Sequence, residues 1–314
     1  MKRLAVVAGF FLCLWPVFSF AIENAPYLIV LGIAQDGGYP QAGCNKECCR
    51  QFYRGQQPKK HITCLALIDP QTKKSWMFEC TPDFGEQLQL LRRHLHDSAH
   101  LPSGIFITHA HIGHYSGLTQ LGKEVMGTHN IPVYAMPRMS SFLKNNGPWS
   151  QLAAQHHIAL TELSNLSAVS LGANISVKPV QVPHRDEYSE TVGFDIRFGN
   201  KSVLFIPDID KWEKWDYPNQ LFPGDSFPVK LQKLVAAYSY VLIDGTFFKN
   251  GELPGRDMSE IPHPFIEETM RLLEALPAET KNRIYFIHFN HTNPVLRSAP
   301  VSSFRFATEL MILN

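Results

Sequence analysis

The sequence predicts an α/β protein in which buried strands alternate with amphipathic helices. Short apolar runs rich in β-branched residues recur along the chain, and turn-forming residues follow them. The run 84–95 instead has the apolar spacing of a helix. The chain has 314 residues and contains no internal repeat, low-complexity tract or linker. This length suits one large α/β domain or two small ones.

The first 21 residues have the pattern of a secretory signal peptide. Residues 1–3 contain two basic side chains, residues 4–15 are apolar, and Ser19-Phe20-Ala21 is a small-x-small cleavage signal. The apolar stretch is too short for a comfortable membrane span. We therefore expect cleavage after Ala21, a mature domain over residues 22–314, and a periplasmic or secreted protein without a membrane anchor.

Charge argues against nucleic acid as a partner. The formal net charge is +1, and removal of residues 1–21, which carry two basic residues and no acidic one, leaves −1. A near-neutral chain without a basic run offers no electrostatic footprint for nucleic acid. We expect a small-molecule substrate, and the sequence leaves the oligomeric state open.

In the first half of the chain, the predicted strands are 27–33, 64–68, 76–80, 105–107 and 131–135. Helices are expected over 84–95 and 115–125, and the polar stretch 139–152 has an irregular helical pattern. If the hairpin of strands 64–68 and 76–80 is symmetric about Thr72, Cys64 and Cys80 face each other. A cross-strand disulfide and two buried thiols are then equal alternatives.

In the second half, strands are expected over 175–182, 192–197, 202–206, 240–243 and 284–287. Many of the predicted strands are followed by a residue that can bind metal. These residues are His109, His184, Asp208, Asp244 and His288. Ligands bind at the carboxyl ends of strands in open α/β sheets, so we expect these side chains to meet at one site.

The strand 105–107 runs into three histidines with the spacing H-x-H-x-x-H: His109, His111 and His114. Imidazoles at the end of a buried strand need partners for their ring nitrogens. A divalent transition metal satisfies several imidazoles at once, and neutral imidazole is a common metal ligand. The cluster therefore predicts a metal site.

Three cysteines, Cys44, Cys48 and Cys49, lie within six residues. They could hold a structural zinc ion with a fourth ligand from elsewhere, such as a histidine, and His61 and His263 are weak candidates for that ligand. In an oxidising compartment they could instead form disulfides. The spacing is irregular for a zinc knuckle, so both alternatives stay open.

Together, these motifs resemble the metallo-β-lactamase fold superfamily over essentially the whole mature chain. The family's H-x-H-x-D-H loop matches residues 109–114, its next histidine matches His184 ahead of Thr191-Val192-Gly193-Phe194, and its bridging aspartate and last histidine match Asp208 and His288. The resemblance implies an αββα sandwich, with two mixed β-sheets flanked by helices.

Within the superfamily, the chain is most similar to the coenzyme PQQ biosynthesis protein B family. That family is usually cytoplasmic and its histidine loop is usually degenerate, whereas this chain has a predicted signal peptide and keeps three histidines. The resemblance therefore implies an exported paralogue with its own task. The stretches that carry it are Gly37-Gly38-Tyr39-Pro40-Gln41 with Cys44, Thr81-Pro82-Asp83, Asp244-Gly245-Thr246-Phe247, Arg256-Asp257-Met258 and Thr292-Asn293-Pro294.

The superfamily resemblance also implies roles for the ligands. His109, His111 and His184 would hold one zinc ion with an open coordination position, and Asp208 would bridge to a second ion held by His114 and His288. Such a site implies hydrolysis of an ester, amide or phosphodiester by metal-activated water. Zinc, as one or two ions, is the expected cofactor, and iron is the alternative.

Gly113 departs from the superfamily, which has an aspartate there. The change has three possible consequences: a weakened second site and a mononuclear hydrolase, a pair tuned to iron and redox chemistry, or a carboxylate supplied by Asp36, Asp83 or Asp210. Two histidines and one carboxylate, which remain at the second site, are the ligand set of non-haem iron oxygenases. The alternatives to a hydrolase are therefore an iron-dependent oxidase or hydroxylase and a non-catalytic binding protein.

Other polar residues have less definite roles. Asp208 and His291 are the candidate catalytic residues beyond the metal itself, with His291 as a proton donor, a partner that orients a ligand, or a structural histidine. Asp36, Asp83 and Asp244 could orient a ligand or contact the substrate.

Overall fold

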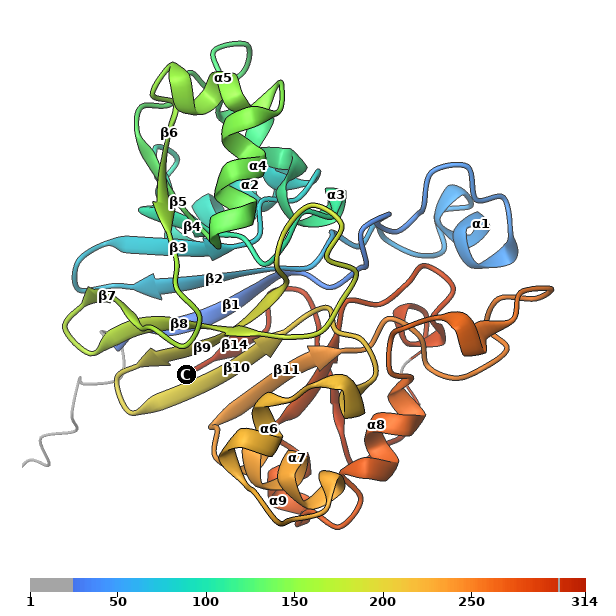
Figure 1. Cartoon of the computed structure of the whole chain (residues 1–314). Coiled ribbons are helices and arrows are strands. Elements are labelled where there is room, and N and C mark those ends of the chain that lie inside the picture. Colours follow the sequence, from blue (N-terminus) through green and yellow to red (C-terminus); the bar gives the residue numbers. More distant parts are fainter. Residues whose placement is uncertain (1–24, 299) are drawn as a thin grey trace, which may run out of the picture.

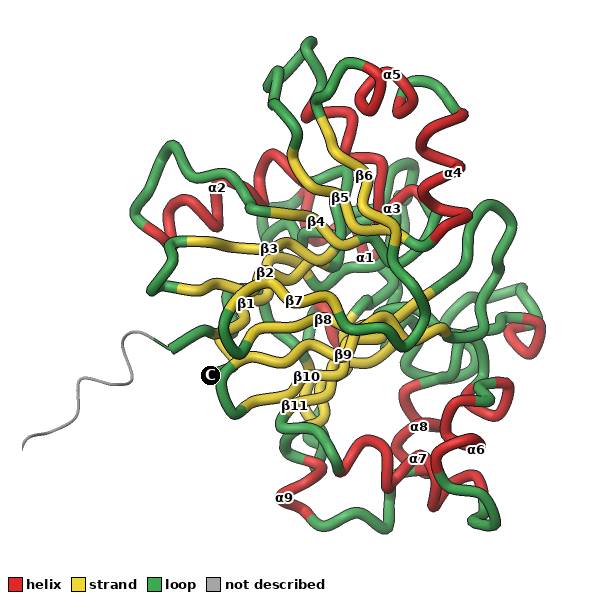
Figure 2. Tube along the Cα trace, turned by 60° about the vertical axis from the view of Figure 1, so that its left-hand side comes forward, coloured by secondary structure: helices red, strands yellow, loops and turns green. Residues whose placement is uncertain are grey.

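The strands form two seven-stranded β-sheets that lie face to face, with helices outside both sheets (Figures 1 and 2). The computed structural model describes residues 25–298 and 300–314, so the predicted signal peptide lies outside the described residues. Within those two ranges, no helix is both long and apolar enough to cross a membrane. The predicted αββα sandwich with two mixed sheets is confirmed.

The first sheet takes all but one of its strands from residues 27–162. Its strands up to β3 pair antiparallel, and those from β3 to β6 pair parallel. In spatial order they are β14 (Ile312–Leu313), β1 (Tyr27–Gly32), β2 (Cys64–Asp69), β3 (Lys74–Phe78), β4 (Gly104–Phe106), β5 (Ile131–Ala135) and β6 (Ile158–Glu162).

The second sheet also has an antiparallel part and a parallel part. Its strands from β7 to β10 pair antiparallel, and those from β10 to β13 pair parallel. The parallel strands of each sheet end on the same side, where the metal-binding residues follow them. In spatial order the strands are β13 (Arg305–Phe306), β12 (Ile284–Ile287), β11 (Tyr240–Asp244), β10 (Lys201–Ile206), β9 (Val192–Phe198), β8 (Ile175–Gln181) and β7 (Val169–Gly172).

One helix forms where the sequence predicts it, and another is shorter than expected. Helix α2 (Phe84–Leu95) has the predicted bounds. The helix expected over 115–125 is a short α3 (Ile112–Tyr115) followed by a 3₁₀ helix, Ser116–Leu121. Glycine is a poor helix former, and Gly117 and Gly122 interrupt this stretch. The remaining helices are α1 (Glu47–Tyr53), α4 (Pro137–Asn145), α5 (Trp149–Ala154), α6 (Tyr217–Leu221), α7 (Phe227–Ala236), α8 (Ile266–Leu272) and α9 (Ala278–Lys281).

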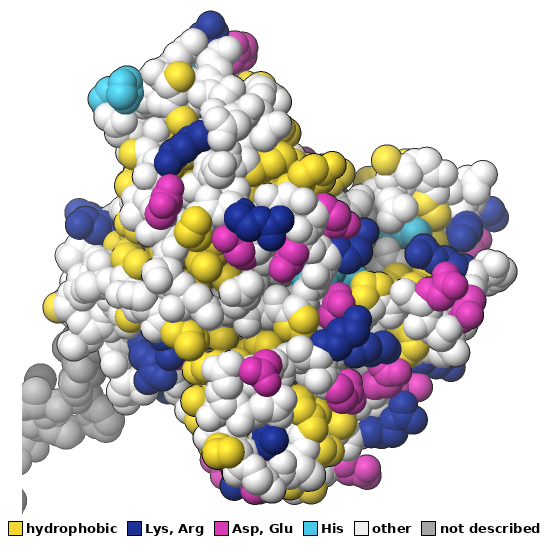
Figure 3. Space-filling view, viewed as in Figure 1, with side chains coloured by type: hydrophobic (Ala, Val, Ile, Leu, Met, Phe, Trp, Pro, Cys, Tyr) yellow, Lys and Arg dark blue, Asp and Glu magenta, His cyan; other side chains and the backbone are white. Residues whose placement is uncertain are grey.

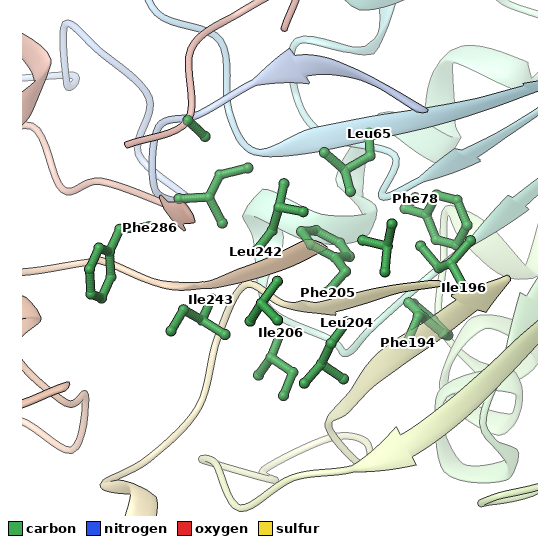
Figure 4. Close-up of a cluster of buried hydrophobic side chains, with 14 of the residues drawn as sticks. Leu65, Phe78, Phe194, Ile196, Leu204, Phe205, Ile206, Leu242, Ile243 and Phe286 are labelled. Carbon is green, nitrogen blue, oxygen red and sulfur yellow. The ribbon is translucent and has the colours of Figure 1, made fainter. Parts of the chain in front are cut away.

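The largest core cluster fills the layer between the sheets (Figure 4) and continues under α7 and α8, on the other face of the second sheet. In β2, Leu65 and Leu67 face this layer, whereas Cys64, Ala66 and Ile68 join a second cluster under the helices that cover the first sheet. A strand buried on both faces is apolar at successive positions, which explains its unbroken apolar run. Aromatic side chains join the two sheets: the ring centroids of Phe78 and Phe194 are 5.6 Å apart.

Cys64 and Cys80 are two buried free thiols in this structure, one of the two alternatives left open by the sequence. The hairpin is not symmetric about Thr72, because Leu65 pairs with Phe78. That register shifts Cys80 by one position relative to Cys64, so the two sulfurs do not occupy paired positions. The Cys64 thiol instead donates to the Leu65 and Glu79 carbonyls, each at 3.6 Å.

Candidate metal centre

The histidine loop lies between β4 and α3 and turns two of its imidazoles into the protein. His109 and His114 are buried, and His111 is half-buried at the edge. The second sheet contributes His184, which follows β8, and Asp208, which follows β10. The sandwich therefore brings the two groups of strand ends to one place, as the sequence predicts.

The first group of potential ligands consists of His109, His111, His184 and Asp208, whose ligand atoms lie within 4.8 Å of one another. Asp208 Oδ2 lies 3.5 Å from His109 Nε2 and 3.3 Å from His184 Nε2. His111 Nδ1 lies 2.8 Å from His109 Nε2. Three imidazoles and a carboxylate that converge in this way form a nitrogen-rich donor set suited to zinc.

The second group consists of Asp36, His114, Asp208 and His288, again within 4.8 Å. Asp36 Oδ1 lies 3.0 Å from His114 Nε2 and 3.3 Å from His288 Nε2. Asp208 belongs to both groups, and its Oδ2 lies 3.8 Å from His114 Nε2. A carboxylate shared in this way can bridge two cations.

The geometry around Gly113 explains why this position lacks a side chain. A Cβ atom there would lie 2.5 Å from Asp36 Cα and 2.6 Å from Asp36 Oδ1. The space that an aspartate would need at position 113 is thus filled by Asp36, which arrives from the loop after β1. Of the three carboxylates considered for the missing ligand, Asp36 is the one that the structure brings to the second group.

The other two carboxylates lie elsewhere. Asp83 forms an ion pair with Lys59 at 2.8 Å and accepts a hydrogen bond from the backbone N–H of Ile62 at 2.9 Å, so it is in neither group. Asp210 Oδ1 lies 3.3 Å from Nδ1 of His184. Asp210 is therefore placed to orient a ligand.

Every imidazole of the two groups also has a polar partner on its other ring nitrogen. Such partners fix the ring orientation and the tautomer that presents a lone pair to a metal. The contacts are Thr108 Oγ1 to His109 Nδ1 at 2.9 Å, Glu187 Oε2 to His111 Nε2 at 3.1 Å, Glu79 Oε1 to His114 Nδ1 at 3.1 Å, Asp210 Oδ1 to His184 Nδ1 at 3.3 Å and Thr246 Oγ1 to His288 Nδ1 at 3.0 Å.

Glu79 is a site residue that the sequence analysis did not single out. Its carboxylate is fully buried and contacts His114 Nδ1, Thr108 Oγ1 and the Thr108 N–H. Its φ is +82°, an uncommon conformation for a residue with a side chain, and such strain gathers at functional sites. The available signal was an acidic residue inside the apolar run 76–80.

We expect Glu79→Gln to weaken metal binding at the second group by roughly 10–100-fold, because the amide orients His114 less strongly than the carboxylate. Competition with a fluorescent chelator measures this affinity. Glu86→Gln, on the surface of α2, is the matched control. Equal affinities in the wild-type chain and in Glu79→Gln would contradict the positioning role.

Charge pairing keeps the carboxylates ionised. Burial raises the pKa of Asp36, but the adjacent His114 and His288 outweigh burial, so this pKa lies well below its ordinary value. The pKa of Asp208 is likewise held low against burial, by His184 and His263. Burial lowers the pKa of His109, whereas Asp208 outweighs burial at His184 and raises its pKa to about 10. Ionised carboxylates are ready to bind a cation.

His263 lies beside the two groups rather than near the cysteines. Its Nδ1 is 2.8 Å from Asp244 Oδ2 and 3.2 Å from Asp208 Oδ1. Asp244 also accepts hydrogen bonds from the backbone N–H groups of Ile209 and Thr246. Asp244 thus holds His263 and the backbone after β10. Sequence reasoning missed this contact because no motif links residues 208, 244 and 263.

The cysteines form a third group, which includes His291. Ligand atoms of Cys44, Cys48, Cys49 and His291 lie within 4.8 Å of one another, and all three thiols are free. His291 Nδ1 also lies 3.1 Å from Gln41 Oε1. The structure therefore places His291 beside the cysteines, and the candidate fourth ligand of that group is His291 rather than His61 or His263. Three thiols and one imidazole are a structural zinc set.

We expect Cys49→Ser to remove about one zinc ion per chain and to lower the melting temperature, because structural zinc contributes folding free energy. Elemental analysis and a thermal melt measure both effects. Cys64→Ser, a buried thiol outside the group, is the control for loss of a thiol. Unchanged zinc content in Cys49→Ser would rule out zinc at the cysteines.

The fold and the two groups of ligands define a class of protein. Residues 76–289 match the beta-lactamase superfamily domain, and this chain belongs to that family. It contains a buried His/Asp cluster that could bind metal. The family assignment made from the motifs is confirmed.

The individual proteins to which this chain is similar have low sequence identity to it. The chain is 25% identical over 297 residues to the coenzyme PQQ synthesis protein B of Pseudomonas protegens, which covers 86% of this chain and 91% of that protein. The structure is similar to Zn²⁺-bound PqqB from Methylobacterium extorquens, with a TM-score of 0.72, 19% identity, and coverage of 92% and 99% of the two chains. A diphosphatase of the PhnP family gives a TM-score of 0.60 at 19% identity, with coverage of 92% and 96%.

Proposed function

We propose that this chain is an exported metal-dependent hydrolase that cleaves an ester, amide or phosphodiester bond of a small molecule. The observation that carries the proposal is the position of Asp208. Its carboxylate is shared by two ligand groups, one rich in histidine and one with a second carboxylate from Asp36. Two adjacent cation sites joined by one carboxylate suit hydrolysis.

The residues present fit a pair of divalent metal ions. Asp208 Oδ2, the oxygen that faces both groups, lies buried 3.3–3.8 Å from Nε2 of His109, His114 and His184. Ring nitrogens and a carboxylate oxygen that converge in a buried place need a shared partner, and a cation would satisfy them. The inward ring nitrogens of His109, His111 and His184 crowd one another in the same way.

His109, His111, His184 and Asp208 would hold one ion, and Asp36, His114, Asp208 and His288 would hold the other. Metal ions held there would supply Lewis-acid chemistry and would activate water for hydrolysis near neutral pH. The chain's own contribution is to orient these ligands through the partners of their second ring nitrogens. Burial of Asp208 and His109 keeps bulk water away from the ligands.

Iron-dependent oxidation is the second candidate. The second group offers two histidines and two carboxylates, and imidazole and carboxylate ligands also suit iron. The similarity to coenzyme PQQ synthesis protein B over most of the chain adds weight to this alternative. A measurement of bound metal therefore distinguishes the two candidates, because zinc supports the hydrolase and iron supports the oxidase.

The test is the metal content of protein purified from the exported fraction without added metal. Zinc in the two groups, together with turnover of ester, amide or phosphodiester substrates, supports the hydrolase. Bound iron with oxygen consumption replaces it with the oxidase. A chain without metal in these groups overturns both enzymes and leaves a binding protein. The mass of the exported chain reports cleavage after Ala21.

A further inference from the structure

A hollow of about 640 Å³ opens beside the two ligand groups. It reaches them through Thr246 and His263, which contact His288 and Asp208 respectively. Its walls come from the loop after β11, the loop after β12 and the segment that carries the cysteines. A molecule held in this hollow can therefore present a bond to the metal centre.

Basic side chains line this hollow from three distant parts of the sequence: Lys46, Arg185 and Arg256. Glu260 is the only carboxylate among the described residues of the lining, and the other polar groups include the neutral amides Gln35, Gln41 and Asn290. In Figure 3, dark blue Lys and Arg side chains lie beside the small cyan histidine areas on the right-hand half of this face, whereas the histidine at the upper left stands apart from them. The hollow thus has an excess of positive charge.

These cations are poorly neutralised by the protein. In the part of the chain that the structure describes, neither the Lys46 nor the Arg256 side chain has a hydrogen-bond or ion-pair partner, and the contact of Arg185 with Glu187 is long, at 3.8 Å. Some exposed cations elsewhere are closely paired, such as Lys144 with Glu162 at 3.1 Å and Lys233 with Asp225. Several positive charges around a concave site raise the local concentration of anions there.

Two of the three cations are fixed to the ligand groups by the chain itself. Arg185 directly follows His184, and Lys46 lies between Cys44 and Cys48. The cysteine group therefore holds the loop that presents Lys46 to the hollow, next to His291 and Gln41, which also line it. This arrangement gives the cysteine group a role in shaping the pocket as well as in stability.

We infer that the substrate carries an anionic group, a carboxylate or a phosphate, that binds Lys46, Arg185 and Arg256 in this hollow while the bond to be cleaved lies at the metal centre. Arginine forms paired, charge-assisted hydrogen bonds with such groups, and lysine adds a point charge. This inference rests on the proposed hydrolase and defines its substrate class.

The test uses the metal-loaded full-length chain titrated calorimetrically with succinate and with inorganic phosphate. Arg256→Gln and Lys46→Gln should each weaken binding of the preferred anion by roughly 10-fold, since each removes a charge-assisted contact. Arg93→Gln, an exposed cation on α2 outside the hollow, should leave the affinity unchanged. The stronger of the two probes identifies the anion as carboxylate or phosphate.

Equal anion affinity in wild type, Arg256→Gln and Lys46→Gln overturns the inference, because the anion then binds at the metals or elsewhere. Thermal melts of the variants check that they fold. The proposed hydrolase is judged separately, by turnover of neutral substrates and by metal content. Weakened anion binding in a chain without hydrolytic activity would support the anion pocket while rejecting the hydrolase.

Discussion

Replacement of Asp208 by alanine is expected to remove metal from both ligand groups and to lower hydrolytic activity by roughly 10³-fold or more. The reason is that one carboxylate serves both groups, so its loss takes a ligand from each ion. A metal site contributes several kcal/mol to a hydrolytic transition state, and each 1.36 kcal/mol is about tenfold in rate. Elemental analysis and steady-state kinetics measure the two effects.

Asp69→Ala provides the matched control for this variant. Asp69 is also a buried carboxylate, but it lies at the turn between β2 and β3 and bonds Thr72 Oγ1 at 2.6 Å. This variant should keep its metals even where its stability falls. If Asp208→Ala retained both ions, the shared role of Asp208 would be wrong, and the two groups would have to bind metal independently.

The second large effect concerns Asp36 and Gly113. Gly113→Asp alone should destabilise the chain by about 1–3 kcal/mol and disturb the second ligand group, because its Cβ would overlap Asp36. Asp36→Ala alone should remove one ion and leave the other at the histidine-rich group. The double variant Asp36→Gly/Gly113→Asp moves the carboxylate to the superfamily position and removes the overlap with the Asp36 side chain, but the 2.5 Å approach to the Cα of residue 36 stays. It should therefore recover the second ion in part.

Metal content and thermal melts of the three variants decide this prediction. The double-mutant comparison isolates the coupling between the two positions, since each single change alone is harmful. Additive losses in the double variant would mean that Asp36 does not replace the absent aspartate. Asp83→Ala is the control, because that carboxylate pairs with Lys59 outside both groups.

Much of the fold and most of the ligands could be predicted from local patterns. Apolar runs identified the long central strands, and polar residues directly after them identified His109, His184, Asp208 and His288. These signals can be read from neighbouring residues, because a buried strand is a continuous apolar run and the turn that ends it is polar. Short edge strands such as β7 and β14 were missed, because so few residues carry no reliable period.

The remaining site residues depended on contacts that no local pattern encodes. Asp36 could not be chosen over Asp83 or Asp210, since the choice depends on which loop fits against Gly113 in space. His291 follows His288 by only three residues, yet its ring lies beside the cysteines. Spacing along the chain gives no direction for a side chain in an irregular loop.

The origin of Asp36 has a consequence for the order in which the protein assembles. Asp36 and His288 are 252 residues apart in sequence, and their loops are joined where Gln35 N donates to Phe289 O at 2.8 Å. Closing so long a loop costs conformational entropy before any ligand contact can compensate. A metal ion in the second group would therefore need a nearly complete chain, and by binding the native state alone it would stabilise the contact between the two sheets late in folding. An incomplete chain would lack this ion, whatever the supply of metal.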